Sequence, residues 1–126
     1  MYGMIDIKMA DGTVAQMPFM ANAATPIRLK QIFQTDFWKT FGTKEEVTEE
    51  NITENLDVIS ELAYVMHCQA EKRDMMAENF EKYVAWLETL DGIAILNKAS
   101  EIISLYISME QQGSSAKNPD GLPQGK

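Results

Sequence analysis

The only histidine and the only cysteine of this chain are neighbours, and both are residue types used for metal binding and nucleophilic catalysis. His67 and Cys68 lie in a stretch with helical periodicity, where adjacent side chains point about 100° apart around the axis. The pair therefore cannot converge on one ion, and the sequence has no Cys-x-x-Cys or His-x-x-x-His spacing. We expect His67 to be a surface or partly buried histidine and Cys68 to be a small core residue.

Carboxylates are the next group that could do chemistry, and pairs at helical spacing occur, such as Glu45 with Glu49 and Glu46 with Glu50. With 19 Asp and Glu residues in a chain of 126, such pairs are expected without any catalytic purpose. The glycines are isolated turn signals or lie near the C-terminus, so no glycine-rich loop is present to bind a phosphate. The sequence therefore predicts no enzyme, no cofactor and no metal site.

Most of the net charge of −8 comes from one short stretch. Residues 43–61 contain seven acidic side chains and a single basic one, Lys44. Such a stretch suits a solvated loop and a helix N-terminus, where acids favour the macrodipole, or an acidic docking strip for a basic partner. An isoelectric point near 4.6 argues against direct binding to nucleic-acid phosphates.

The elements that must position these residues begin with a β-hairpin. Residues 2–9 alternate charged side chains with Ile5 and Ile7, and this period of two is typical of a half-buried strand. An Asp-Gly dipeptide follows, which accepts the backbone of a tight turn, and residues 14–20 form the return strand. Pro18 lacks the N–H that a ladder needs, which favours an edge strand or a strand end.

Helices account for most of the remaining chain. A Thr-Pro start and an apolar stripe of Leu29, Phe33, Phe37 and Phe41 predict one helix from Pro26 to about Phe41. Apolar spacings of three and four predict three more helices, with a break at Arg73–Met76: about 53–72, from Phe80 to near Asp91, and from near Leu96 to about Met109.

Together these elements predict an α+β fold that is mostly α-helical, with a short N-terminal β-hairpin followed by about four helices. Residues 1–111 form one domain, and residues 112–126 form a disordered C-terminal tail with too little apolar surface to fold. The chain shows no membrane-spanning run and no signal peptide, so we expect no membrane partner. A single cysteine suits a reducing cytoplasm.

Methionines and tryptophans are the candidates for contact with a protein partner. The chain has nine methionines, more often core filler than an adaptable binding surface. Trp38 and Trp86 lie off the main apolar stripes of their helices, which suggests an interface. We take Trp38, Met75, Met76 and Trp86 as candidate partner-binding residues.

Four blocks of this sequence resemble the tail assembly chaperones of long-tailed phages and prophages of Gram-positive bacteria. The first block, residues 21–33, is similar to the strand exit and Thr-Pro-Ile-Arg helix start of that family. The other three follow in the family's order, and together the blocks span about residues 1–110: 59–71, 83–87 and 99–106.

The resemblance implies a non-enzymatic chaperone that binds the tape measure protein and keeps it soluble while the tail tube polymerises. It also implies location in the host bacterial cytoplasm, absence from the mature virion and, in many members, a longer product made by ribosomal frameshifting. Such a product would recruit tail tube protein, and residues 116–118 and 124–126 can be encoded by slippery heptamers. Self-association stays open, as does the alternative of a small acidic regulator or inhibitor of a basic or DNA-binding protein.

Overall fold

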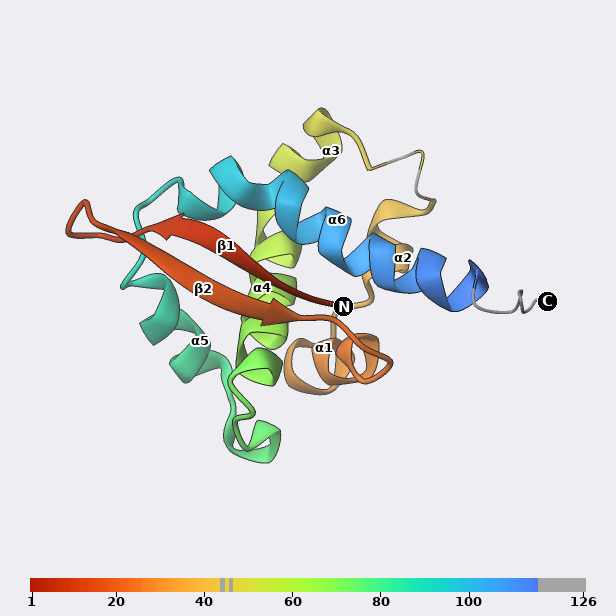
Figure 1. Cartoon of the computed structure of the whole chain (residues 1–126), viewed down its shortest axis with the longest axis horizontal. Coiled ribbons are helices and arrows are strands. Elements are labelled where there is room, and N and C mark those ends of the chain that lie inside the picture. Colours follow the sequence, from red (N-terminus) through yellow and green to blue (C-terminus); the bar gives the residue numbers. More distant parts are fainter. Residues whose placement is uncertain (44, 46, 116–126) are drawn as a thin grey trace.

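The structure is a computed structural model that describes residues 1–43, 45 and 47–115, with side chains through residue 108. Two strands form an N-terminal hairpin, and helical segments make up the rest (Figure 1). In chain order the elements are β1 (Tyr2–Lys8), β2 (Val14–Met20), α1 (Thr25–Phe33), α2 (Phe37–Phe41), α3 (Glu49–Glu54), α4 (Leu56–Ala70), the 3₁₀ turn η2 (Met75–Ala77), α5 (Phe80–Leu87) and α6 (Ala94–Ser115).

The predicted hairpin and the predicted α+β class are confirmed. β1 and β2 pair antiparallel in a register that runs from Tyr2 opposite Met20 to Lys8 opposite Val14. Gly12 has a φ of 92° in the turn, a conformation that favours glycine. Because the sheet has only these two strands, Pro18 lies on an edge strand as expected.

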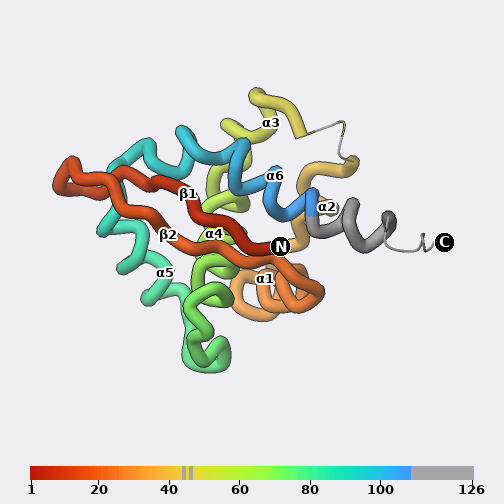
Figure 2. The backbone as a smooth tube through the Cα atoms, in the orientation of Figure 1, coloured from red at the N-terminus to blue at the C-terminus, as the bar shows by residue number. Residues whose placement is uncertain are grey.

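The hairpin packs on α4 and α6. Figure 1 shows α4 crossing behind the strands, and the tube in Figure 2 shows α6 running beside β1. Side chains are buried all around α4, including Leu62, Ala63, Tyr64 and Met66, so this helix forms the centre of the core. A two-stranded sheet is marginal by itself in water, and this packing supplies the apolar burial that stabilises it.

The predicted first helix is wrong in one respect, because it is two helices. Gln34 adopts a left-handed conformation with φ of 59° and donates its N–H to the carbonyl of Lys30, which ends α1. Asp36 then starts α2 by accepting the N–H of Lys39 at 3.1 Å. The apolar stripe stays in the core, but the break lets Phe37 turn its ring onto Tyr106 of α6.

The second predicted helix also starts earlier than expected and is interrupted. Thr48 caps α3 by accepting the N–H of Asn51, so the acidic connector contains a helix of its own. Asn55 ends α3 and precedes α4, and its side-chain amide donates to the carbonyl of Asn51 at 2.9 Å. Thr53, the expected start, lies inside α3.

The C-terminal half follows the expected order. Helix α4 ends just before the predicted break, where Lys72 has a φ of 57°, and the short turn η2, which Asp74 caps, begins within the break. The last helix, α6, continues to Ser115, past the expected end at Met109 and into the start of the expected tail. Residues 116–126 of that tail lie outside the described residues. No helix in the described part of the chain is long and apolar enough to cross a membrane.

Candidate protein-binding surface

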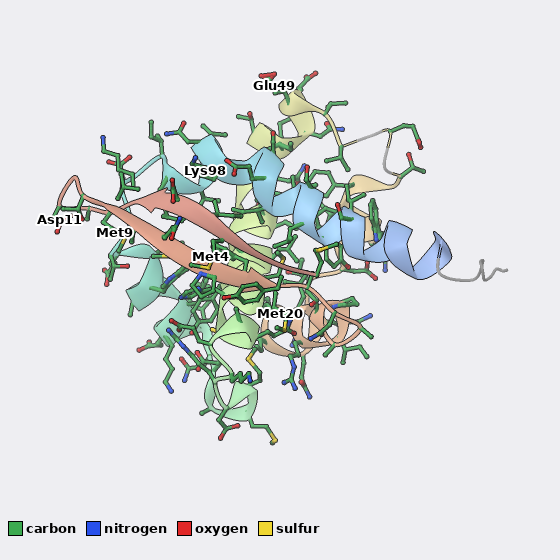
Figure 3. The ribbon with its side chains drawn as sticks, in the orientation of Figure 1. Met4, Met9, Asp11, Met20, Glu49 and Lys98 are labelled. Carbon is green, nitrogen blue, oxygen red and sulfur yellow. The ribbon has the colours of Figure 1, made fainter. Side chains whose placement is uncertain are left out.

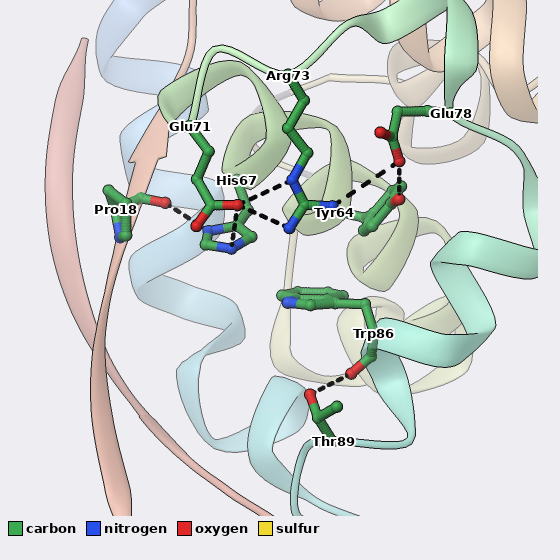
Figure 4. Close-up of polar contacts among 8 residues, drawn as sticks. All are labelled: Pro18, Tyr64, His67, Glu71, Arg73, Glu78, Trp86 and Thr89. Carbon is green, nitrogen blue, oxygen red and sulfur yellow. Dashed lines mark hydrogen bonds and ion pairs between the residues drawn. The ribbon is translucent and has the colours of Figure 1, made fainter.

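Four titratable side chains, those of His67, Glu71, Arg73 and Glu78, form a line of polar contacts from β2 to η2 (Figure 4). His67 Nδ1 lies 2.8 Å from the carbonyl oxygen of Pro18, and its Nε2 lies 3.4 Å from Glu71. Arg73 binds the same Glu71 carboxylate at 2.7 Å and lies 3.9 Å from Glu78. This line connects the hairpin edge to the segment that follows α4.

The line ends on a buried carboxylate. The side chain of Glu78 is only 4% exposed, and it accepts a hydrogen bond from the hydroxyl of Tyr64. At the other end, the His67 ring is buried between Phe19 and Trp86, with centroid distances of 5.5 Å to both. The single histidine is therefore a buried anchor that holds β2 on α4.

The pKa values of the thiol and phenol groups in this region do not favour a nucleophilic side chain. Burial raises the pKa of the Cys68 thiol to about 11 and the pKa of Tyr83 to about 12. Burial, together with the hydrogen bond to Glu78, also raises the pKa of Tyr64. All three groups keep their protons at neutral pH, whereas a reactive cysteine needs a lowered pKa. Cys68 is a buried core residue, as expected.

Metal binding has no visible basis in the same region. Across the described residues, no group of three or more His, Cys, Asp and Glu side chains is arranged to hold a metal ion. Gln69, two residues after the histidine, donates from Nε2 to the carbonyl of Met20 and to the Thr25 hydroxyl, both at 2.9 Å. The polar side chains of His67 and Gln69 on α4 therefore form hydrogen bonds within the protein itself.

A different surface of the protein carries apolar side chains that do not pack into the core. We define the outer hairpin face as Tyr2, Met4, Pro18 and Met20, on the side of the hairpin opposite the buried Ile5 and Ile7. Tyr2 is 54% exposed and Met4 is 47% exposed, and Pro18 and Met20 are half-buried. The four form two cross-strand pairs in the register, and Figure 3 shows Met4 and Met20 over the hairpin ribbon.

A groove of about 400 Å³ lies beside this face, between β1 and α6. Met4 and Ile5 line one side, and Ser104 and Leu105 line the other. Gly3 lies against Leu105 here, and a Cβ at this position would make an ordinary contact 3.4 Å from Leu105 Cδ1. The groove continues the apolar surface of the outer hairpin face onto α6.

The free edge of β1 borders the same groove. Met9 donates its N–H to the carbonyl of Thr13, which places the bonded ladder pairs at odd-numbered residues of β1. The even-numbered residues therefore turn their main-chain groups toward the free edge: Tyr2, Met4 and Asp6. Exposed edges of this kind pair readily with added segments.

One end of this edge is covered within the molecule. The carbonyl of Lys8 accepts the N–H of Asp91 at 3.0 Å, and Ala10 donates to the carbonyl of Thr89 at 2.9 Å. These bonds tie the tip of the hairpin to the connection between α5 and α6. The open part of the edge is therefore the part beside the outer hairpin face.

The four contact residues expected from the sequence do not form one surface. Trp86 is 8% exposed and stacks on His67, and Met75 is 9% exposed, so both belong to the core. Trp38 is half-buried and stacks on Tyr106 with centroids 6.4 Å apart. Met76 is 92% exposed on η2. Trp86 and Met75 therefore lie in the core of the free protein, whereas Met76 is exposed.

Most of the described acidic side chains of this stretch are exposed. Glu49 and Glu50 occupy the first turn of α3, where negative charge is favourable. Glu61 differs, because burial raises the pKa of its half-buried carboxyl, while the Thr35 hydroxyl donates to it at 2.7 Å. This geometry accords with the interpretation as a helix start, and it also leaves exposed acids for a basic partner.

The outer hairpin face was not predicted, because the alternation of the hairpin sequence was used only to assign the inward residues. The same alternation that predicts Ile5 and Ile7 as core puts Tyr2 and Met4 on the opposite side, where an apolar residue has no packing role.

Comparisons of this chain with protein-family models, curated proteins and solved structures found no match.

Proposed function

We propose that this protein is a non-enzymatic tail assembly chaperone of a long-tailed phage or prophage. Its partner is the tape measure protein, which it keeps soluble while the tail tube forms. The order of the four sequence blocks supports this proposal. The outer hairpin face supports it further, because apolar surface beside a groove suits an amphipathic helix of a partner.

The single observation on which the binding role depends is the exposure of Tyr2 and Met4 in one cross-strand cluster. Monomeric proteins seldom leave contiguous apolar surface of this kind unless it binds something. The methionines add to this, since flexible thioethers adapt to partners of varied shape. Met4 and Met20 lie on this face, and Met1 lines the groove.

Location and the longer product are part of the same proposal and depend on the family resemblance. The protein acts in the host bacterial cytoplasm and is absent from the finished virion. A frameshifted product would carry an added domain that recruits tail tube protein. Both candidate slippery sites, residues 116–118 and 124–126, lie outside the described residues, so the nucleotide sequence is the direct test.

The first experiment is co-expression with the product of the long, helix-rich reading frame expected directly downstream of this gene. The variant Tyr2→Ser with Met4→Ser removes the two most exposed side chains of the outer hairpin face, and the unchanged protein should keep more of that product soluble than this variant does. The matched control is Ile27→Ser with Ile93→Ser, which removes exposed apolar side chains elsewhere: 67% and 56% exposed, respectively. The control should keep the product soluble.

Equal solubility with both variants would remove the outer hairpin face from the binding role. Failure of the unchanged protein to keep the product soluble would count against the chaperone role itself.

The alternative, an acidic regulator or inhibitor of a basic or DNA-binding protein, is favoured by one observation. Glu49 and Glu50 are exposed next to each other on α3, in the stretch with the largest excess of negative charge. For that function Glu49→Gln with Glu50→Gln would weaken binding, and about 0.5 M salt would abolish it through screening. Apolar binding at the hairpin would survive both changes.

A further inference from the structure

The two edges of the hairpin differ in how their main-chain groups are used. On β2, Pro18 has no N–H to offer, and its carbonyl oxygen lies 2.8 Å from His67 Nδ1. The next outward carbonyl of β2, that of Met20, accepts from Gln69 Nε2 at 2.9 Å. No hydrogen bond within the described part of the chain uses the outward main-chain groups of β1 over residues 2–6. At this end of the hairpin the sheet therefore has one closed edge and one open edge.

The edge of β1 is already extended at the tip of the hairpin. Met9 forms an antiparallel bridge with Leu90. Residues 89–91 thus occupy the place of a third strand beside β1, and we call the continuation of this line along residues 2–6 the third-strand position. The groups exposed there are main-chain donors and acceptors with the spacing of a strand. An extended segment satisfies such groups, whereas a helix has already used its own.

The surroundings of the third-strand position leave space for an extended chain. The groove of about 400 Å³ lies here, and Figure 2 shows α6 running beside β1. On the α6 side, the groove is lined by a row of small side chains at a spacing of four: Ser100, Ser104 and Ser108. This row is about 12 Å long, and residues 2–6 span about 13 Å. The row therefore matches the open part of the edge in length.

Charge decides between two kinds of extended segment. Asp6 is exposed at one end of the open edge, and Glu101 of α6 lines the groove with a side chain that is 55% exposed. A second copy of this chain would bring the same two acids again and a further net charge of −8. A segment with a basic residue near Asp6 would instead find opposite charge there.

We propose that the third-strand position binds an extended segment of a partner protein, antiparallel to β1 as residues 89–91 are. A Lys or Arg of the segment lies opposite Asp6, apolar residues lie opposite Met4 and Tyr2, and small residues between them face α6. This inference rests on the proposed binding role of the outer hairpin face and adds the part of the partner that binds at its edge. The added strand widens the apolar face on which a partner helix packs.

The test is a titration of the ¹⁵N-labelled full chain with the acetylated and amidated peptide Thr-Lys-Ser-Val-Ala-Val-Thr, up to several millimolar. In the proposed register, its Lys pairs with Asp6 and its two Val residues pair with Met4 and Tyr2. Saturable downfield shifts of the amide protons of these three residues are expected, together with cross-strand contacts between the peptide and β1. No saturable shift over residues 2–6 would overturn the proposal.

A pair of methylated peptides separates strand addition from general apolar contact. The two Val residues direct their N–H groups toward β1, and the Ser and Ala between them direct theirs away. N-methylation of both Val residues should weaken binding at least about tenfold, because two hydrogen bonds are lost. The matched control, with N-methyl groups on the Ser and the Ala, should bind far better. Equal weakening by the two patterns would contradict a main-chain ladder.

On the protein side, Asp6→Asn should weaken binding of the unmethylated peptide about threefold, as expected for an exposed ion pair. Glu88→Gln makes the same change in net charge at an exposed residue outside the groove and should bind as the unchanged protein does. Equal effects of the two variants would remove Asp6 from the site.

The competing occupant is a second copy of this chain. A peptide-free protein that dimerises with slow amide exchange over residues 2–6 would overturn the proposal in favour of that occupant. The co-expression experiment above is separate, because Tyr2→Ser with Met4→Ser changes side chains and leaves the main-chain edge in place. A soluble partner product without peptide binding would therefore reject the added strand and keep the proposed function.

Discussion

The two faces of the hairpin are built from the same two strands, yet they have opposite relations to the rest of the molecule. The inner face carries Ile7 and Phe19, both fully buried against the helices. The outer face carries Tyr2 and Met4, which are apolar too but about half exposed. Apolar residues on the inner face are explained by the fold, and those on the outer face are not. The difference separates residues that stabilise the domain from residues available to a partner.

The largest expected effect is on the inner face. Phe19→Ala should lower the free energy of unfolding by about 3–5 kcal/mol, because it leaves a cavity between the sheet and α4. Tyr2→Ser with Met4→Ser should change it by less than about 1 kcal/mol. Chemical denaturation monitored by circular dichroism measures both changes in the free energy of unfolding. Equal losses would mean that the outer face contributes as much to stability as the inner face does.

A loss of similar or slightly smaller size is expected at Trp86, which the sequence suggested as a contact residue. Trp86→Ala should lower the free energy of unfolding by about 3–5 kcal/mol, because the ring packs on His67 and Tyr64 in the core. Thermal unfolding checks this directly. A variant as stable as the unchanged protein would return Trp86 to the list of surface candidates.

A smaller loss is expected where the polar line reaches η2. Glu78→Ala should cost about 1–3 kcal/mol, because it leaves the buried hydroxyl of Tyr64 without its acceptor. Glu78→Gln is the control, since its amide oxygen still accepts that bond. Equal losses for the two variants in urea denaturation would show that the charge of Glu78, and not the hydrogen bond, matters here.

The smallest effect is a dependence on pH. The Cys68 pKa is raised from 9.0 to about 11 by burial, so folding favours the protonated thiol. This contribution to stability is fully present below pH 9 and is lost as the pH rises through about 11. Cys68→Ala should remove that part of the pH profile. In the unchanged protein, iodoacetamide at pH 8 should label Cys68 only after unfolding, and rapid labelling of the native state would contradict its burial.

The sequence was sufficient to predict the hairpin, since the alternation around Ile5 and Ile7 and the Asp-Gly turn are local signals. It was also sufficient for α4, whose apolar residues recur over four turns. The break between α1 and α2 was missed because the phenylalanine spacing continues unbroken across it. The local signal was Asp36, a good cap that is unfavourable inside a helix.

Candidate contact residues were harder to predict, because exposure depends on the phase of each helix. The third predicted helix begins at the apolar residue Phe80, and Trp86 was expected to lie off the main apolar stripe of this helix. In the structure Phe80 is 61% exposed and Trp86 is 8% exposed, so the buried face is turned from the expected one. A helix of eight residues has few positions that fix this phase, and the partner helix α4 decides it.

The most direct test of the outer hairpin face is hydrogen–deuterium exchange of the protein alone and in complex with the proposed partner, the tape measure protein. The main-chain N–H groups of Tyr2, Met4 and Asp6 face the open edge of β1 and should exchange rapidly in the free protein. In the complex, slower exchange at residues 2–6 is the result we expect. Unchanged exchange there, with new protection confined to α3, would contradict binding at the hairpin and favour the acidic stretch.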